Sequence, residues 1–282
     1  DENSVLTTYG AAAIQTNGNT EGLTLNVNGT VVSEGDVAMY LPQVKECNVG
    51  GKAVISGTTG IEIRAGILNV EDGAKISATE NTLTAKANGN GSTVTGAAIA
   101  VSPHSTNLPI AVTVNGGEFS CANSIYEAYL EPAERTAETK LEIKGGKFNA
   151  PVYSENCNGF ITGGTFAEGA QPEVEYLAEG FVVGAEGEVF EFHAEASEWG
   201  VVGDLTSWGN NDIAMYTTWH TKNLFVAYNV EITSGAFKIR ANNQWNDAKN
   251  YGLEVAGSIN PNKYYKVITS GGSQNITPME YG

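Results

Sequence analysis

Short alternating strands that end in paired glycines recur through the first two thirds of the chain. The clearest copies are VTVNGGEF, LEIKGGKF and GFITGGTF, which begin at residues 112, 141 and 159. In each copy apolar residues alternate with polar ones, two glycines follow, and a phenylalanine closes the phrase. The copies are unevenly spaced, since 29 residues separate Gly116 from Gly145 and only 18 separate Gly145 from Gly163. This region is therefore a repeat of short strands with connections of variable length.

Such a repeat predicts an all-β fold of stacked coils. A propeller needs blades of matched size, whereas a solenoid stacks its strands about 4.8 Å apart and tolerates loops of different lengths. Asn and Gly at the corners permit the left-handed backbone that sharp bends require. We predict a right-handed parallel β-helix over residues 1–170, with about eight or nine coils of roughly 20 to 25 residues each.

The sequence also predicts a cover for the end of this solenoid. An open sheet edge invites aggregation unless another element covers it. Residues 176–192, YLAEGFVVGAEGEVFEF, read as two alternating segments around a GAEG turn. The β-helix domain with its capping hairpin is thus expected to span 1–192, and HAEASE, residues 193–198, to serve as a linker.

The stretch KGGKFNAPVYSENCNGFITGGTFAEG, followed by EYLAEGFVV, resembles β-helix proteins on gut bacterial surfaces. Related solenoids occur in secreted adhesins and in phage-borne proteins. The resemblance covers roughly residues 20–192. It implies an architecture and says little about a ligand.

The last third of the chain differs from the first two thirds in its residue composition. All four tryptophans lie after residue 196: Trp199, Trp208, Trp219 and Trp245. In FKIRANNQW, residues 237–245, the period of two places Phe237, Ile239 and Ala241 on one side of a strand. Lys238, Arg240 and Asn242 fall on the other side. We predict that this second side is exposed, so that long hydrogen-bond donors lie beside a tryptophan.

Three phrases of this region resemble the carbohydrate-binding modules of SusE/SusF-type starch-binding outer-membrane lipoproteins. They are EWGVVGDLTSWGNNDIAMY, NLFVAYNVEITSGAFKIRANNQWNDAKNYG and GGSQNITPMEYG. The resemblance implies a small β-sandwich over residues 197–282. It also implies a last strand beyond Gly282, so either that strand lies outside this sequence or the sandwich keeps an open edge.

Sugar chemistry explains why such residues belong together. A sugar ring has an apolar face, on which an aromatic ring stacks, and a rim of hydroxyls that fixed donors and acceptors recognise. We expect Trp245 and Trp208 to be the platforms and the polar residues of the strand to be the donors, as the resemblance also implies. The predicted site is Trp208, Lys238, Arg240, Asn242, Asn243 and Trp245. The ligand predicted is a neutral polysaccharide, and the resemblance points to an α-glucan such as starch.

Other readings of these residues remain open. Trp199 fits core packing better than ligand contact, and Trp219 fits either role. The charges of Lys238 and Arg240 are also compatible with an exposed strand face that only meets solvent. Asn242 and Asn243 are also typical of a turn.

Charge narrows the range of partners. The net charge is −17, and 25 acidic against nine basic residues give residues 1–196 a net charge of −16, whereas the remainder carries −1. An acidic surface repels phosphate backbones and anionic lipid, which argues against nucleic acid. No apolar run is long enough to span a membrane. The chain starts at Asp1, so we expect that a leader or anchor was removed or lies outside it, and we expect a secreted, cell-surface protein.

Catalytic and metal-binding patterns are missing from the sequence. Glycoside hydrolysis needs two carboxylates about 5 to 10 Å apart, yet the only aspartates in residues 1–196 are Asp1, Asp36 and Asp72. Three cysteines are too few and too scattered for a disulfide framework or a zinc site. We therefore expect a non-catalytic glycan-binding protein without cofactor or metal. The alternative is a structural or adhesive fibre segment of a cell surface or virion, and a polysaccharide lyase or hydrolase ranks below both.

Overall fold

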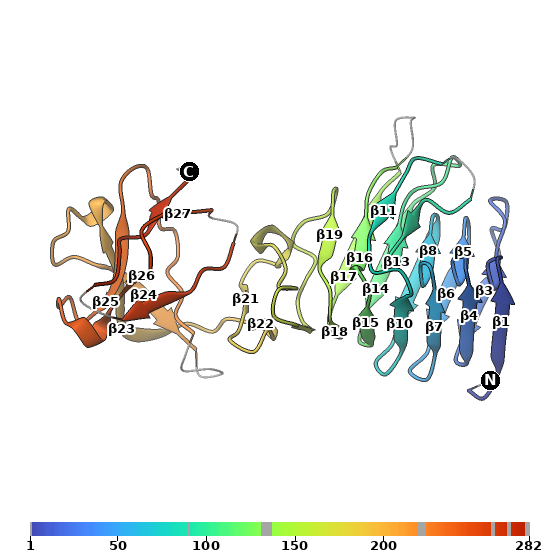
Figure 1. The fold of residues 1–282 in the computed structure, drawn as a ribbon, viewed down its shortest axis with the longest axis horizontal. Helices are drawn as coiled ribbons and strands as arrows, with labels where there is room; N and C mark the ends of the chain where they lie inside the picture. Colours follow the sequence, from blue (N-terminus) through green and yellow to red (C-terminus); the bar gives the residue numbers. More distant parts are fainter. Residues whose placement is uncertain are drawn as a thin grey trace. The chain divides into compact units, whose positions relative to one another are not determined.

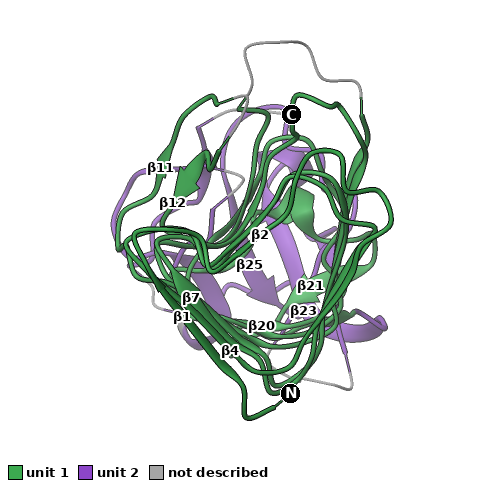
Figure 2. Ribbon diagram, turned by 90° about the vertical axis from the view of Figure 1, so that its right-hand side faces the viewer, with its two compact units in different colours: residues 1–191 green, residues 192–282 purple. Residues whose placement is uncertain are grey.

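The computed structural model describes residues 2–88, 91–130, 137–218, 224–260, 263–269 and 272–279. It is nearly all β, with 44% strand and 3% helix, which confirms the predicted fold class. The chain divides into two compact units, residues 1–191 (unit 1) and residues 192–282 (unit 2), coloured separately in Figure 2.

Unit 1 is a parallel β-solenoid of about six turns, and its successive coils lie side by side in Figure 1. The first of its three sheets contains β1 (Val5–Tyr9), β4 (Thr30–Glu34), β7 (Val54–Gly57), β10 (Lys75–Ala78), β15 (Glu118–Ser120), β18 (Lys147–Phe148) and β20 (Thr165–Phe166). The second contains β2 (Ile14–Gln15), β5 (Met39–Leu41), β8 (Ile61–Ile63), β13 (Ala97–Val101), β16 (Asn123–Glu127) and β19 (Val152–Ser154). The third contains β3 (Thr24–Val27), β6 (Glu46–Val49), β9 (Gly66–Val70), β14 (Ile110–Val114) and β17 (Thr139–Ile143).

The parallel β-helix is thus confirmed, but the expected eight or nine coils were too many. One cause is an insertion between β10 and β13. Lys75 of β10 pairs with Glu118 of β15, so a single coil contains the whole of that insertion.

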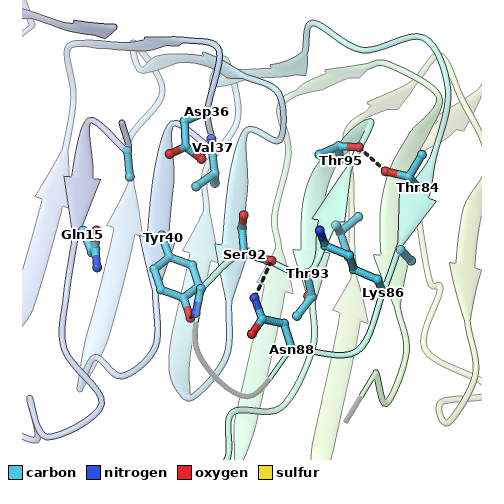
Figure 3. Close-up of a pocket in the computed structure, with 14 residues that line it drawn as sticks. Gln15, Asp36, Val37, Tyr40, Thr84, Lys86, Asn88, Ser92, Thr93 and Thr95 are labelled. Atoms are coloured by element: carbon cyan, nitrogen blue, oxygen red, sulfur yellow. Dashed lines mark hydrogen bonds between the residues drawn. The ribbon is translucent and has the colours of Figure 1, made fainter. Parts of the chain in front are cut away.

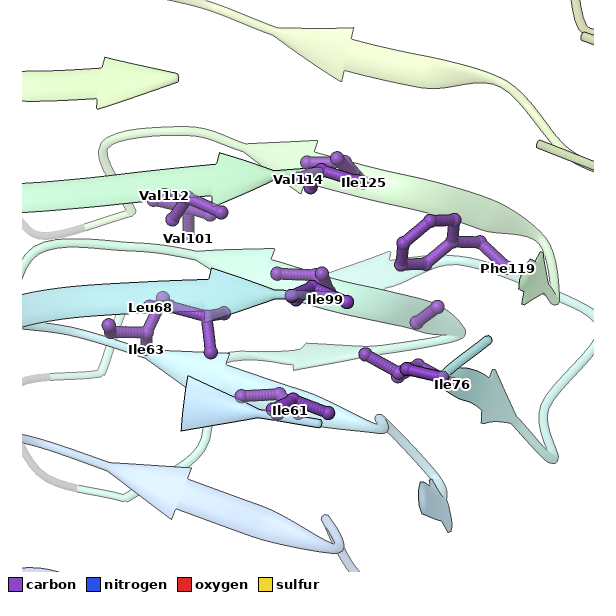
Figure 4. Packing of buried hydrophobic residues seen from close by; sticks show 14 of the residues in the cluster. Ile61, Ile63, Leu68, Ile76, Ile99, Val101, Val112, Val114, Phe119 and Ile125 are labelled. Atoms are coloured by element: carbon purple, nitrogen blue, oxygen red, sulfur yellow. The ribbon is translucent and has the colours of Figure 1, made fainter. Parts of the chain in front are cut away.

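The closing phenylalanine of the repeated phrase builds the core of the first sheet. Phe119, Phe148 and Phe166 occupy matching positions on consecutive coils and stack on one another, with ring centroids 4.9 Å and 4.5 Å apart. Inward-facing residues of the second sheet, such as Ile61, Ile99 and Ile125, stack in the same way, and Figure 4 shows this aliphatic packing.

The paired glycines shape the corner before each phenylalanine. Gly117, Gly146 and Gly164 have φ angles of +103°, +112° and +104°, which residues with a Cβ rarely adopt. A Cβ on Gly146 would also lie 3.2 Å from the carbonyl oxygen of Gly117 in the preceding coil. The repeated Gly-Gly therefore reflects both the bend and the close stacking of the corners.

A short antiparallel pair follows the last coil. After the 3₁₀ turn η1 (Val174–Tyr176), β21 (Phe181–Val183) pairs with β22 (Val189–Glu191) around the GAEG turn. Thr165 of β20 forms an antiparallel bridge with Glu188, and the Val189 amide donates to the carbonyl of Gly164 at 2.8 Å. This pair thus occupies the strand edge beside β20.

The insertion folds over the outer face of the second sheet as a small hairpin, β11 (Thr84–Ala85) and β12 (Val94–Thr95). Beneath the hairpin lie Glu62, which is in β8, and Arg64, which directly follows β8. Both side chains are fully buried. Both Glu62 carboxylate oxygens accept from the Thr93 amide at 2.9 and 3.0 Å, and one also accepts from its hydroxyl at 2.7 Å. The Arg64 guanidinium donates to the backbone carbonyls of Asn88 and Gly91 at 2.9 and 3.0 Å. Two buried charged side chains thus fasten the hairpin to the solenoid.

Glu62 should make this fastening sensitive to pH. Burial raises the pKa of Glu62 to about 7, an effect that the Thr93 hydrogen bonds and the Arg64 charge offset only in part. Between pH 4.5 and 7 the closed hairpin therefore holds a proton that the open hairpin has released. The contribution of Glu62 to closure is complete below that range and is lost as the pH rises through 7.

We expect the hydrogen-exchange protection factor of the Thr93 amide to fall by about two orders of magnitude across that pH range. Glu62→Gln keeps the shape and an acceptor but does not titrate, so its protection factor should change much less with pH. Equal pH dependence in the two proteins would show that Glu62 does not control the hairpin.

Unit 2 is built around one antiparallel sheet. Its order is β24 (Ile213–Thr217), β23 (Glu195–Gly203), β25 (Phe237–Ala241), β26 (Asn250–Leu253) and β28 (Val267–Thr269). A separate pair, β27 (Ser258–Ile259) and β29 (Thr277–Pro278), is parallel, and the short 3₁₀ turns η2 (Asp204–Thr206) and η3 (Asp247–Lys249) interrupt the loops. Trp199 is partly buried and packs on Phe225 and Tyr251 on one face of the sheet, with ring centroids 5.8 and 5.1 Å apart.

Candidate functional site

Strand β25, which carries the predicted donors, is covered on the side that was expected to be exposed. Lys238 and Arg240 are buried, whereas Phe237 and Ile239 are only partly buried. The Lys238 ammonium donates to the carbonyl and hydroxyl of Ser273 at 2.5 and 3.0 Å, and burial lowers its pKa. The prediction of an exposed polar face was therefore wrong, because segments distant in sequence fold over it.

Arg240 forms the centre of this covered face. Its Nε and Nη2 donate to the two carboxylate oxygens of Asp212 at 2.8 and 2.7 Å, and Nη2 also donates to the Gly209 carbonyl. The side chains of Arg240 and Asp212 are 0% and 4% exposed. The guanidinium carbon also lies 4.5 Å from the ring centroid of Trp245, which is a cation–π contact. Arg240 thus supports an aromatic ring, and its donors face the protein interior, which corrects the expectation that they face a ligand.

The structure brings Trp208 and Trp245 together. Their ring centroids are 6.0 Å apart and their planes are inclined by 31°. Trp245 is 52% exposed and Trp208 is partly buried. The Trp208 indole N–H donates to Asp204 at 2.8 Å, which fixes the orientation of that ring. Two indoles from separate loops therefore form one aromatic surface beside solvent, and we call Trp208 and Trp245 the indole pair.

Two left-handed turns position the indole pair. Ser207 and Trp208 have φ angles of +52° and +54°, and Asn242 and Asn243 have +53° and +56°. Asn and Asp adopt this conformation more readily than most residues, whereas it is uncommon for serine and tryptophan. The Gln244 amide donates to the Ala241 carbonyl at 3.0 Å and closes the second turn just before Trp245.

Asn242 belongs to the framework of that turn. Its side-chain amide donates to Glu198 at 2.8 Å, and Lys249 binds the same carboxylate oxygen at 2.7 Å. Hydrogen bonds from Lys249 and Asn242 lower the pKa of Glu198. Asn243 is exposed and lies two residues before Trp245. Of the predicted donors, Asn242 and Asn243 are both exposed, but the Asn242 side-chain amide is bound to Glu198 of β23.

Two acidic residues at this site were not foreseen from the sequence. Asp204 holds the Trp208 indole, and Asp212 holds Arg240. The role of Asp204 could have been predicted from the sequence, because Asp204 follows a glycine and precedes Trp208 by four residues. A carboxylate at the start of a short turn can accept hydrogen bonds from the residues that follow it. Nothing local to Asp212 marks it as the partner of an arginine on another strand. Trp219, for which core and site were both open, lies outside the described residues.

The described residues contain no group of three or more His, Cys, Asp or Glu side chains arranged to hold a metal ion. Within the same ranges, no helix is long and apolar enough to cross a membrane.

No family model, no curated protein and no solved structure matches this chain. The resemblances to SusE/SusF-type modules and to bacterial-surface β-helix proteins therefore gain no support from known proteins. The function has to be inferred from the geometry of the chain itself.

Proposed function

We propose that unit 2 binds a neutral polysaccharide on the indole pair, without catalysis. The observation that carries this proposal is the mutually inclined arrangement of two neighbouring indole rings, of which Trp245 is 52% exposed and Trp208 is partly buried. Aromatic faces exclude water from the apolar face of a sugar ring, and two inclined faces follow a curved chain better than a single plane. This favours a helical α-glucan such as starch, which the resemblance to SusE/SusF-type modules also implies.

We expect hydrogen bonds to the sugar hydroxyls to come from exposed amides that lie close to the two tryptophans in sequence. Asn243 and Gln244 precede Trp245, and Asn210 follows Trp208 in the neighbouring loop; all three are exposed. Amides both donate and accept, as do hydroxyls. The near-neutral charge of unit 2 agrees with an uncharged ligand. The buried pair of Arg240 and Asp212 keeps the aromatic surface rigid, which limits the entropy lost on binding.

The solenoid of unit 1 is then a stiff acidic stalk for this module. We propose that the protein acts outside the cell, at a cell surface. An open aromatic surface buries little area, so we expect a dissociation constant on the order of 0.01–1 mM. Multivalent display on a surface would offset this weakness.

Affinity electrophoresis in gels that contain amylose, pullulan or dextran tests the proposal. We expect retardation in at least one gel, and we expect Trp245→Ala to weaken binding by about tenfold or more, which corresponds to about 1.4 kcal/mol. Tyr264→Ala is the matched control, because Tyr264 is an aromatic residue of the same unit that is 56% exposed. Its binding should equal that of the wild type.

Unretarded migration of the wild type in all three gels would defeat the α-glucan proposal. Retardation that persists unchanged in Trp208→Ala and Trp245→Ala would remove the indole pair as the site. A protein that binds no neutral glycan at all would favour the structural or adhesive fibre segment over glycan binding.

A further inference from the structure

A groove with a mixed polar and apolar lining lies on unit 1, between the β11–β12 hairpin and the first coils of the solenoid. Its volume is about 510 Å³, and Figure 3 shows its lining. Gln15 and Tyr40, which pair in register on adjacent coils, contribute to one side together with Asp36. Lys86, Asn88 and Ser92 of the insertion contribute to the other. The groove exists only because the insertion folds over the sheet.

The walls of this groove are held in place by buried contacts. Arg64 binds the Asn88 and Gly91 carbonyls of the insertion, and it also donates to the Tyr40 hydroxyl at 3.2 Å. The same hydroxyl accepts from the Gly91 amide at 2.8 Å. Glu62 fixes Thr93 on the other arm of the hairpin. Glu62 and Arg64 are fully buried, and their partners on the insertion are buried or partly buried. We therefore expect the groove to be formed before any ligand arrives, as is usual for small-molecule sites.

The lining indicates the class of ligand. Among the lining residues that the structure describes are two carboxamides and several hydroxyls, and the one carboxylate of this set, Asp36, is balanced by its one ammonium, Lys86. Carboxamides and hydroxyls donate and accept, which suits a ligand rich in hydroxyl groups. A lipid or an apolar peptide would need a larger apolar lining, and an anion would need an excess of cations.

We propose that this groove is a second binding site, on unit 1, for a short segment of a neutral saccharide. This site is independent of the indole pair. The protein would then hold a glycan at two places with unrelated architecture, one a pair of indoles and the other a groove lined by amides, hydroxyls and small apolar side chains.

The test uses the full chain with Trp208→Ala and Trp245→Ala, so that the indole pair no longer contributes. Maltohexaose, cellohexaose, xylohexaose and mannohexaose are each added, and hydrogen exchange is followed at residues 12–16 and 91–95. We expect at least one hexasaccharide to slow exchange in both segments. Hexagalacturonate, which is anionic, should have no effect.

Ala85→Trp fills the groove from the hairpin, since Ala85 lines it. Ala87→Trp is the matched control, because Ala87 is exposed on the same insertion and does not line the groove. Ala85→Trp should weaken binding at least about tenfold, and Ala87→Trp should leave it unchanged. Gln15→Ala, at an exposed position, should also weaken binding without added bulk.

The proposal fails if none of the four neutral hexasaccharides protects the chain that lacks both indoles. It also fails if Ala85→Trp and Gln15→Ala bind as well as the control, or if hexagalacturonate binds as tightly as the neutral sugars. Because the indole pair is already removed in this background, failure here leaves the function proposed for unit 2 untouched.

Discussion

Replacing Arg240 with alanine should destabilise unit 2 by about 3–5 kcal/mol, the usual result of removing one partner of a buried ion pair. Asp212 would remain buried with no positive charge beside it and without its two guanidinium hydrogen bonds. The Trp245 ring would also lose the cation with which it is in contact. We therefore expect both lower stability and a weaker hold on any ligand that stacks on the indole pair.

Urea denaturation followed by tryptophan fluorescence measures this effect in unit 2 alone, because all four tryptophans follow residue 196. Arg240→Lys keeps the charge but cannot bind both carboxylate oxygens in the same planar geometry, so it should fall between wild type and Arg240→Ala. The double variant Arg240→Met, Asp212→Leu removes both charges and should recover much of the loss.

The same variants decide what Arg240 does. If it is a positioning residue, loss of sugar affinity accompanies loss of stability, and Arg240→Lys shows both in part. If Arg240→Ala abolished sugar binding while the urea midpoint stayed at its wild-type value, the guanidinium would be a direct donor to the ligand. That outcome would restore the role that the strand pattern alone predicted for it.

The repeated phrase made the solenoid predictable because its information is local. Each copy of the phrase specifies a strand, a corner that needs glycine and an inward phenylalanine. When coils with this same local structure stack, Phe119, Phe148 and Phe166 form a column. The number of coils was not predictable in the same way. It depends on where insertions enter, and an insertion leaves the repeated phrase itself unchanged.

Sequence alternation separates the two faces of a strand but does not say which one becomes covered. In FKIRA, the charges of Lys238 and Arg240 predict that their side of the strand is exposed. Both side chains are instead buried, because Ser273 binds Lys238 and Asp212 binds Arg240. Both partners come from segments far away in the chain. In the same way Glu62 and Arg64 have the pattern of ordinary outward residues in IEIR. Only the folded hairpin, with its own buried acceptors and donors, makes them interior residues and creates the groove beside them.

Phe148→Ala should cost about 3–5 kcal/mol, because the ring is fully buried and stacks on a phenylalanine from the coil on either side. Coils of a solenoid contact chiefly their neighbours, so the damage should be local. Amides of β18 and β20 should lose most of their hydrogen-exchange protection, whereas those of β4 and β7 should change little. Lys147→Ala, at the exposed neighbouring position of the same strand, should stay within about 0.5 kcal/mol of wild type.

The pattern of protection also tests how the solenoid holds together. Loss confined to the coils around Phe148 means that each interface between coils contributes separately to stability, as the stacked rings imply. An equal loss of protection in β4, β7, β18 and β20 would mean that unit 1 unfolds as a single cooperative body. The phenylalanine column would then be one part of a shared core, and a cavity in any one coil would lower the stability of every coil.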